Sequence, residues 1–223
     1  MHILLTRPLE DSKELIIKLK SLGHNVSHMP VIKINKLEFK SLDYAEYSGI
    51  IFTSSNSVKF LNTKNIDKFI KCFCVGISTE KNALKKGFQN VYAAEGNVEN
   101  LKEIIIQNVN DKGSKLLYVS GKTIASNLHK QLASEDYLVE RVVNYNVEHV
   151  EEFDKNFIDK LKNSIPEIIF VYSENSAKSL LKIIKKYDLV DYLMNTNLMC
   201  LGEKTSVVLN EVKWKKIFLF NPG

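Results

Sequence analysis

Hydrophobic and polar positions alternate along the chain in a rhythm of short apolar strands and amphipathic helices. Residues 3–6 form a strand with a continuous apolar run, which is typical of burial on both faces of a parallel sheet. Residues 15–22 then carry an apolar stripe at helical spacing, and Gly23 ends that helix. The alternation continues to the end of the chain, and it predicts an α/β fold with parallel sheets.

The same periodicity places the other elements. Further strands are predicted at 50–53, 72–75, 91–93, 116–119, 168–172, 198–201 and 216–220. Further helices are predicted at 56–62, 78–86, 97–108, 123–134, 151–162, 175–187 and 203–211, with Asn97 as an N-cap. Segments 26–34 and 138–147 are extended, and Pro30 interrupts the first, so we expect it to cross away from its sheet.

Three blocks of sequence occur twice in the same order, a little over a hundred residues apart. They are residues 3–8 with 116–121, 50–59 with 169–178, and 74–79 with 200–205. Repetition of this kind predicts two similar lobes, and two lobes that face each other make a cleft.

Composition excludes several classes of protein. The hydrophobic fraction of 44% suits a globular protein, and no window approaches the roughly 18 apolar residues that span a membrane. No signal-peptide pattern opens the chain, so we expect a cytoplasmic protein. The net charge of +5 favours polyanionic ligands, but the lysines are dispersed and no nucleic-acid-binding motif appears. No exposed hydrophobic element is expected to demand a partner, so we expect a monomer.

The three cysteines do not indicate a metal or redox site. Cys72, Cys74 and Cys200 are odd in number and lack the spacing of a ligand set. Cys74 and Cys200 fall at matching positions of the repeat, so we expect them to be small core residues of strands.

Polar turns follow the two matched strands that precede helices. These turns comprise Thr53, Ser54, Ser55 and Asn56 in the first copy and Tyr172, Ser173, Glu174 and Asn175 in the second. Ligands of open parallel sheets bind beyond the carboxyl ends of the strands, and helix N-termini favour anions. The turns therefore predict carboxylate or phosphate binding, with simple helix capping as the alternative.

Two Gly-x-x-Thr turns support the same interpretation. Gly76 to Thr79 and Gly202 to Thr205 follow matching strands, where glycine permits close approach of a backbone. Phosphate-loop, dinucleotide-binding and nucleophile-elbow motifs are absent from the sequence. An enzyme with this sequence would therefore act by binding and positioning its substrate rather than through a dedicated nucleophile.

Two further residues invite a functional interpretation. Arg7, one of only two arginines, ends the first strand, where it can grip a carboxylate or form a structural ion pair. Tyr145 stands in the extended segment where its repeat partner is Ile32. Its phenol can donate a proton into a cleft, or it can be an ordinary half-buried strand tyrosine.

These residues together resemble the uroporphyrinogen-III synthase family over nearly the whole chain. The matching segments are residues 4–8, 51–54, 56–58, 75–76 with 79, 96–97 with 101, 117–119 with 121, 143–145, and 201–202 with 205. Each segment is short, and their order and spacing carry the resemblance.

The resemblance implies an activity and a set of site residues. The family closes the linear tetrapyrrole hydroxymethylbilane, with loss of water and inversion of ring D through a spiro intermediate, and uses no cofactor or metal. Tyr145 matches the family's candidate proton donor, on a substrate that carries eight carboxylates. The implied substrate-binding residues are Arg7, Thr53, Ser54, Ser55, Asn56, Gly76, Thr79, Ser120, Gly121, Tyr172, Ser173, Glu174, Asn175, Gly202 and Thr205.

The resemblance also implies an architecture. Two α/β lobes with parallel sheets are joined by a two-stranded connector, and the substrate lies in the cleft. Residues 1–34 with 149–223 would form one lobe and residues 36–146 the other, with connectors near 31–36 and 145–149. A non-catalytic two-lobed binding protein or sensor for an anionic small molecule is the alternative.

Overall fold

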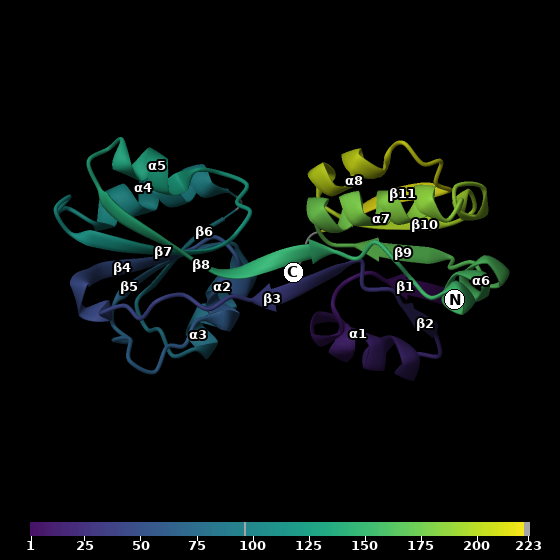
Figure 1. The fold of residues 1–223 in the computed structure, drawn as a ribbon, viewed down its shortest axis with the longest axis horizontal. Helices are drawn as coiled ribbons and strands as arrows, with labels where there is room; N and C mark the ends of the chain where they lie inside the picture. The colour runs from purple at the N-terminus through teal and green to yellow at the C-terminus, as the bar shows by residue number, and fades with distance from the viewer. Residues whose placement is uncertain (96, 221–223) are drawn as a thin grey trace. The chain divides into compact units, whose positions relative to one another are not determined.

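The computed structural model describes residues 1–95 and 97–220 and divides into two compact units. Unit 1 comprises Met1–Ile34 together with the chain from Glu148 onward, and unit 2 comprises Asn35–Val147. The chain passes between the units within β3 (Ile32–Lys36) and β8 (Leu138–His149), which are neighbours in one sheet (Figure 1). Gly96, which belongs to the segment that resembles the synthase family, lies outside the described residues.

Unit 1 is built on a parallel sheet with the strand order β11-β10-β9-β1-β2. Its strands are β1 (His2–Leu5), β2 (Asn25–His28), β9 (Ile168–Val171), β10 (Asn197–Leu201) and β11 (Lys216–Phe220). Its helices are α1 (Leu9–Ser21), α6 (Lys155–Asn163), α7 (Glu174–Lys186) and α8 (Glu203–Leu209).

Unit 2 contains the sheet β3-β8-β7-β4-β5-β6, in which the strands from β8 to β6 are parallel. Its remaining strands are β4 (Tyr47–Phe52), β5 (Lys71–Val75), β6 (Val91–Ala94) and β7 (Lys115–Gly121). Its helices are α2 (Ser55–Phe60), α3 (Ile77–Lys85), α4 (Val98–Asn108) and α5 (Leu128–Ala133), with short 3-10 turns at Tyr44–Glu46 here and at Asp191–Leu193 in unit 1.

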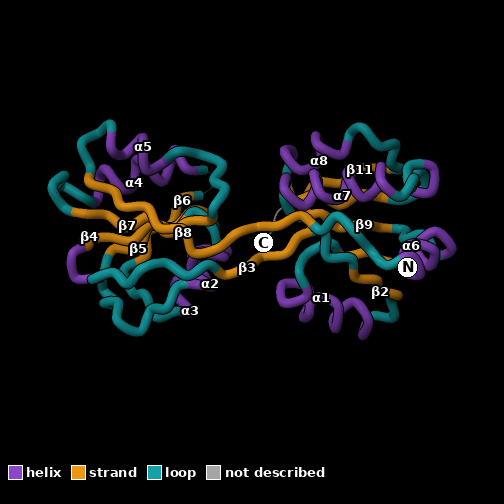
Figure 2. The backbone as a smooth tube through the Cα atoms, in the orientation of Figure 1, coloured by secondary structure: helices purple, strands orange, loops and turns teal. Residues whose placement is uncertain are grey.

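The strand order decides which helices share a face, because crossovers between parallel strands are right-handed. In unit 2 the connections through α2 and α3 run one way along the sheet, and those through α4 and α5 run the other way. The two pairs therefore cover opposite faces, and in unit 1 α7 and α8 lie opposite α1 by the same argument (Figures 1 and 2). The direction reverses between β4 and β7 and between β1 and β9, and ligands of such sheets bind at these switch points.

Apolar strand residues fill both sides of the sheet in unit 2. Ile50 and Phe52 pack with the α2–α3 side, whereas Ile51 and Phe73 pack with the α4–α5 side, and all four are fully buried. A run without polar residues is therefore needed in each central strand. Cys74 and Cys200 are likewise buried, which confirms their expected role as core residues, and Cys72 is buried as well.

Most predicted elements are present, and the parallel α/β fold is confirmed. The helix expected at 123–134 is shorter and comprises Leu128–Ala133, and Lys122 N before it still donates to Tyr145 O at 2.9 Å in the sheet ladder. The helix expected from residue 151 begins at Lys155, since the Asp154 carboxylate caps it by accepting from Phe157 N. Asn97 caps α4 as expected.

One expectation about the surface is wrong. The side chains of Ile217, Phe218 and Leu219 are 38%, 44% and 55% exposed on β11, which lies at the edge of its sheet. An edge strand with exposed apolar residues is a surface that natural proteins usually protect. Unit 1 therefore does present an exposed hydrophobic element.

Candidate functional site

The switch point of unit 1 brings Arg7 and Tyr172 together. The Thr6 hydroxyl donates to Phe170 O at 2.6 Å and ties the ends of β1 and β9 to each other. The Arg7 guanidinium lies 4.6 Å from the centre of the Tyr172 ring and 4.0 Å from the Asp11 carboxylate. Burial raises the pKa of Tyr172, and the charge of Arg7 partly opposes this. Arg7 thus makes the structural ion pair considered above while its side chain stays half-exposed.

The turn before α7 is a helix cap. Ser173 Oγ accepts from Ser176 N at 3.1 Å, as expected of an N-cap residue. Asn175 is exposed, whereas Glu174 pairs with Lys178 at 2.5 Å, and this hydrogen bond lowers the pKa of the Glu174 carboxyl. A charged Glu174 is unsuited to hold a carboxylate, so only part of this predicted turn suits an anion.

Gly76 and Gly202 owe their place to backbone conformation. Their φ angles are 80° and 74°, in the region that side chains rarely adopt, and a Cβ at either position would meet nothing within 4 Å. Backbone conformation therefore accounts for glycine at both positions, and close approach of a ligand there stays a prediction. Thr79 and Thr205 are 3% exposed, and the Thr205 hydroxyl donates to Leu201 O at 2.8 Å, so this hydroxyl serves the helix.

The switch point of unit 2 is bridged by a hydrogen bond that the sequence did not predict. Thr53 Oγ1 and Tyr118 OH lie 2.9 Å apart and join the ends of β4 and β7. Tyr118 is 1% exposed, and its burial raises the pKa of the phenol. Ser54 caps α2 by accepting from Asn56 N at 3.2 Å, and Ser55 is the first helical residue. The predicted turn therefore combines capping with a hydroxyl pair at the carboxyl end of the sheet.

Tyr145 is placed by a bulge in β8. Ser120 pairs with Val143 and Gly121 pairs with Tyr145, so Asn144 is an extra residue in the ladder. Bulges of this kind re-aim a side chain and are common beside active sites. Because of the bulge, two consecutive residues of β8 contact α2: Asn144 Nδ2 donates to the carbonyl of Ser57 at 2.8 Å, and the Tyr145 ring lies beside Phe60.

The Tyr145 ring lies directly on Gly121. A Cβ at position 121 would come within 2.6 Å of Tyr145 Cζ and 2.8 Å of its hydroxyl oxygen. The ring is 8% exposed, and its hydroxyl makes no hydrogen bond within residues 1–95 and 97–220. The phenol is thus held by packing and keeps its hydrogen-bonding capacity for a ligand.

Arg141 holds the backbone on which the Tyr145 ring packs. Its Nε donates to Ser120 Oγ at 2.8 Å, and its Nη2 donates to the carbonyls of Gly121 and Lys122 at 2.7 and 3.1 Å. Ser120 is 1% exposed and serves this network, so its hydroxyl is a support rather than a surface group. Tyr118 and Arg141 lie inside predicted strands, and the scarcity of arginine was the one signal that could have marked Arg141.

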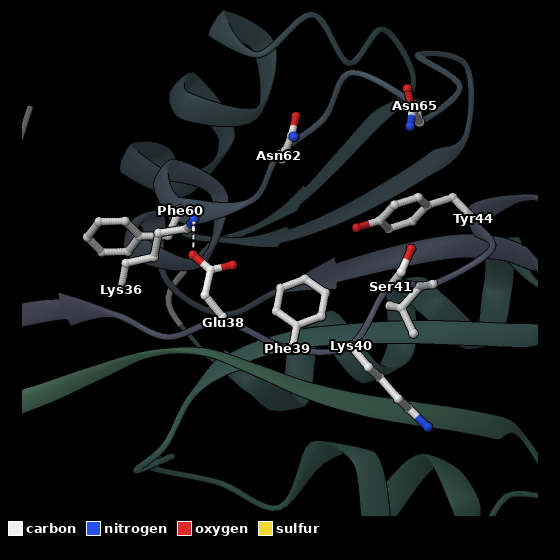
Figure 3. Close-up of a pocket in the computed structure, with 10 residues that line it drawn as sticks. Lys36, Glu38, Phe39, Lys40, Ser41, Tyr44, Phe60, Asn62 and Asn65 are labelled. Atoms are coloured by element: carbon white, nitrogen blue, oxygen red, sulfur yellow. Dashed lines mark hydrogen bonds and ion pairs between the residues drawn. The ribbon is translucent and has the colours of Figure 1, made fainter.

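Two cavities, one in each unit, contain at most one of the predicted site residues. A cavity of about 230 Å³ in unit 2 is lined by Phe39, Tyr44 and Phe60, with Lys36 paired to Glu38 at its rim (Figure 3). Tyr44 and Asn65 of its lining precede β4 and β5, and Phe60 of its lining also lies beside the candidate residue Tyr145. A cavity of about 340 Å³ between α7 and α8 includes Glu174, Glu203 and Lys204 among its lining residues.

Other site classes find no support in the described part of the chain. No group of three His, Cys, Asp or Glu side chains could hold a metal ion there. None of its helices has the length and apolar character to cross a membrane.

Comparisons with known proteins point in one direction. A family model described as uroporphyrinogen-III synthase HemD matches residues 13–219. An uncharacterized protein of Rickettsia prowazekii (strain Madrid E) is 22% identical, over 93% of this chain and 88% of its own length. Porphyrin biosynthesis protein HemD of Ruminiclostridium josui is 24% identical over 92% of this chain, which spans only 42% of that protein.

Solved structures share the fold. Uroporphyrinogen-III synthetase of Helicobacter pylori 26695 superposes with a TM-score of 0.63 at 18% identity, covering 97% of this chain and 91% of that one. A mutant uroporphyrinogen III synthase of the extremely thermophilic bacterium Thermus thermophilus superposes with a TM-score of 0.61 at 15% identity, covering 97% and 92%. At these identities the superpositions establish the architecture alone.

Proposed function

The chain belongs to the uroporphyrinogen-III synthase family, and on that premise we propose that it is the lyase that closes hydroxymethylbilane in porphyrin biosynthesis. The reaction loses water and inverts ring D through a spiro intermediate. The observation that carries this proposal is the family match over residues 13–219, which includes most of both units. The proposed chemistry needs no cofactor, because the substrate itself supplies the reactive azafulvene once its hydroxyl has left.

We propose that Tyr145 is the proton donor of the first step. The lone pair of the pyrrole nitrogen is delocalised through the ring and forms a double bond to the hydroxymethyl carbon as its carbon–oxygen bond breaks. The phenol protonates the departing hydroxyl to give water. The proton lost by the pyrrole nitrogen then restores the phenol. Support comes from the bulge that aims Tyr145, from its packing on Gly121 and from its unused hydroxyl.

The proposed role of the turns is to orient the substrate, since the azafulvene reacts readily and the isomer formed depends on which carbon of ring D attacks. Hydroxyls and helix N–H groups beside Thr53, Ser54 and Ser173 suit carboxylates, and so does the net charge of +5. The proposed lobes are residues 1–34 with 149–223 and residues 36–146. The division of the structure into two compact units, with boundaries at 34/35 and 147/148, supports this proposal. A cytoplasmic monomer remains our proposal, and size-exclusion chromatography with light scattering would test its oligomeric state.

Product analysis tests the proposed function. Freshly made hydroxymethylbilane closes spontaneously to isomer I, so the protein should yield isomer III above the protein-free background after oxidation and chromatographic separation. Unchanged isomer I together with measurable tetrapyrrole binding would instead favour the non-catalytic sensor. A heat-denatured sample of the same protein serves as the control.

A further inference from the structure

Arg141 carries a charge that no carboxylate of the described residues neutralises. Its three hydrogen bonds go to a hydroxyl and two backbone carbonyls, all of them neutral acceptors. These bonds use Nε and Nη2, and the Nη1 donors have no partner in the part of the chain that the structure describes. A half-buried guanidinium that is anchored but unpaired is well suited to bind an anion.

The surroundings of Arg141 add positive charge and hydrogen-bonding groups. Arg141 is the register partner of Tyr118 on the next strand, so both face the α4–α5 side of the sheet. The charge of Arg141 acts on both Tyr118 and His129. Burial and then Arg141 lower the pKa of the His129 imidazole, which favours its neutral form. His129 Nδ1 is buried without a hydrogen-bond partner among the described residues, and Lys122 and Lys130 are exposed nearby in the chain.

We propose that Arg141 binds a carboxylate side chain of a pyrrole acid, as a substrate-binding residue of unit 2 that the sequence-based set does not contain. This rests on the proposed function, for which the ligand is one acetate or propionate arm of the substrate. Arg7 differs, because Asp11 already lies 4.0 Å from its guanidinium. A planar fork explains why arginine stands at position 141 in a chain with only two arginines among 31 basic residues.

The anchoring of Arg141 links binding to catalysis. The guanidinium holds the carbonyls of Gly121 and Lys122, and Gly121 is the surface on which Tyr145 lies. Because three hydrogen bonds already fix the side chain, little conformational freedom is lost when a carboxylate binds. A carboxylate at Arg141 would therefore be held by the same side chain that fixes the backbone under the Tyr145 ring.

Arginine side-chain NMR tests the binding directly. With two arginines in the chain, the ¹⁵N–¹H spectrum contains two Nε signals, which Arg141→Lys assigns. A pyrrole that carries one acetate and one propionate arm should shift the Arg141 signal saturably, and its dimethyl ester should not. An Arg141 signal that stays fixed, or that moves equally with the ester, overturns the proposal.

Steady-state kinetics test the role in turnover. We expect Arg141→Gln to raise KM about ten- to hundredfold, with a smaller rise for Arg141→Lys, which keeps the charge and loses the fork. Lys64→Gln, an exposed charge near the amino ends of the strands, is the matched control and should leave KM within about twofold. An unchanged KM in folded Arg141→Gln would refute the role.

Product analysis and arginine NMR together separate this inference from the proposed function. If the wild-type protein formed only isomer I while the Arg141 signal still responded to the diacid, the binding site would stand and the synthase would fall. If isomer III formed and the Arg141 signal did not respond, the reverse would hold. Thermal unfolding of each variant shows whether a loss reflects misfolding.

Discussion

Replacing Gly121 with alanine should lower turnover strongly while it lowers the free energy of unfolding only modestly. The added Cβ would lie 2.6 Å from Tyr145 Cζ, whereas ordinary van der Waals contact begins near 3.4 Å. The phenol must therefore move by roughly 1 Å, a misplacement that can lower turnover about a hundredfold. The clash is with the far end of one side chain, and no positive φ is involved, so the stability cost should stay within about 1–3 kcal/mol.

The assay measures the rate of isomer III formation beside urea unfolding for wild-type, Gly121→Ala and Gly113→Ala proteins. Gly113 precedes β7 at its other end, where a Cβ would meet only the Asp111 side chain, so this control should keep its activity. A double-mutant cycle with Tyr145→Phe should show that the two substitutions are strongly non-additive. Full activity in folded Gly121→Ala, or additive losses, would refute the placement of Tyr145.

Two further predictions concern stability. Gly76→Ala should destabilise the protein by about 1–3 kcal/mol in chemical denaturation, because a backbone at φ 80° and ψ 150° is strained for any residue but glycine, and an unchanged midpoint would contradict this. Hydrogen bonds from the Tyr47 hydroxyl and then from Lys115 lower the pKa of the Glu140 carboxyl. The charged carboxylate therefore stabilises the fold fully above the unfolded-state pKa of about 4.3. This stabilisation is lost as the pH falls through the lower pKa of the folded state. Glu140→Gln should therefore cost about 1 kcal/mol at neutral pH and little in acid, and a constant difference across the pH range would count against the interaction.

The fold could be predicted from the sequence because strands as apolar as these have to be buried on both faces of a sheet. Residues 3–6 and 50–53 are too apolar for an exposed strand, and each leads into a helix. The matched blocks then set the order of elements in both units. Element ends were less predictable: α5 begins at Leu128 and not at 123, and the sheet ladder reaches Lys122 only through its bond to Tyr145, a residue of another strand.

The candidate site was predictable only in part. Turn residues such as Thr53 and Ser173 are recognisable because they stand between a strand and a helix. Tyr118 looked like an interior strand residue, and nothing local shows that its hydroxyl meets Thr53 across the switch point. The bulge at Asn144 is a property of pairing between two strands, so no single segment can reveal it.

The most direct measurement is a single-turnover reaction of hydroxymethylbilane with excess wild-type or Tyr145→Phe protein, followed by separation of the two isomers. The wild-type protein should form isomer III faster than spontaneous closure. The variant should bind substrate normally and form isomer III about a hundredfold or more slowly, as expected for the loss of a general acid. Isomer III formed by Tyr145→Phe at the wild-type rate would contradict the account.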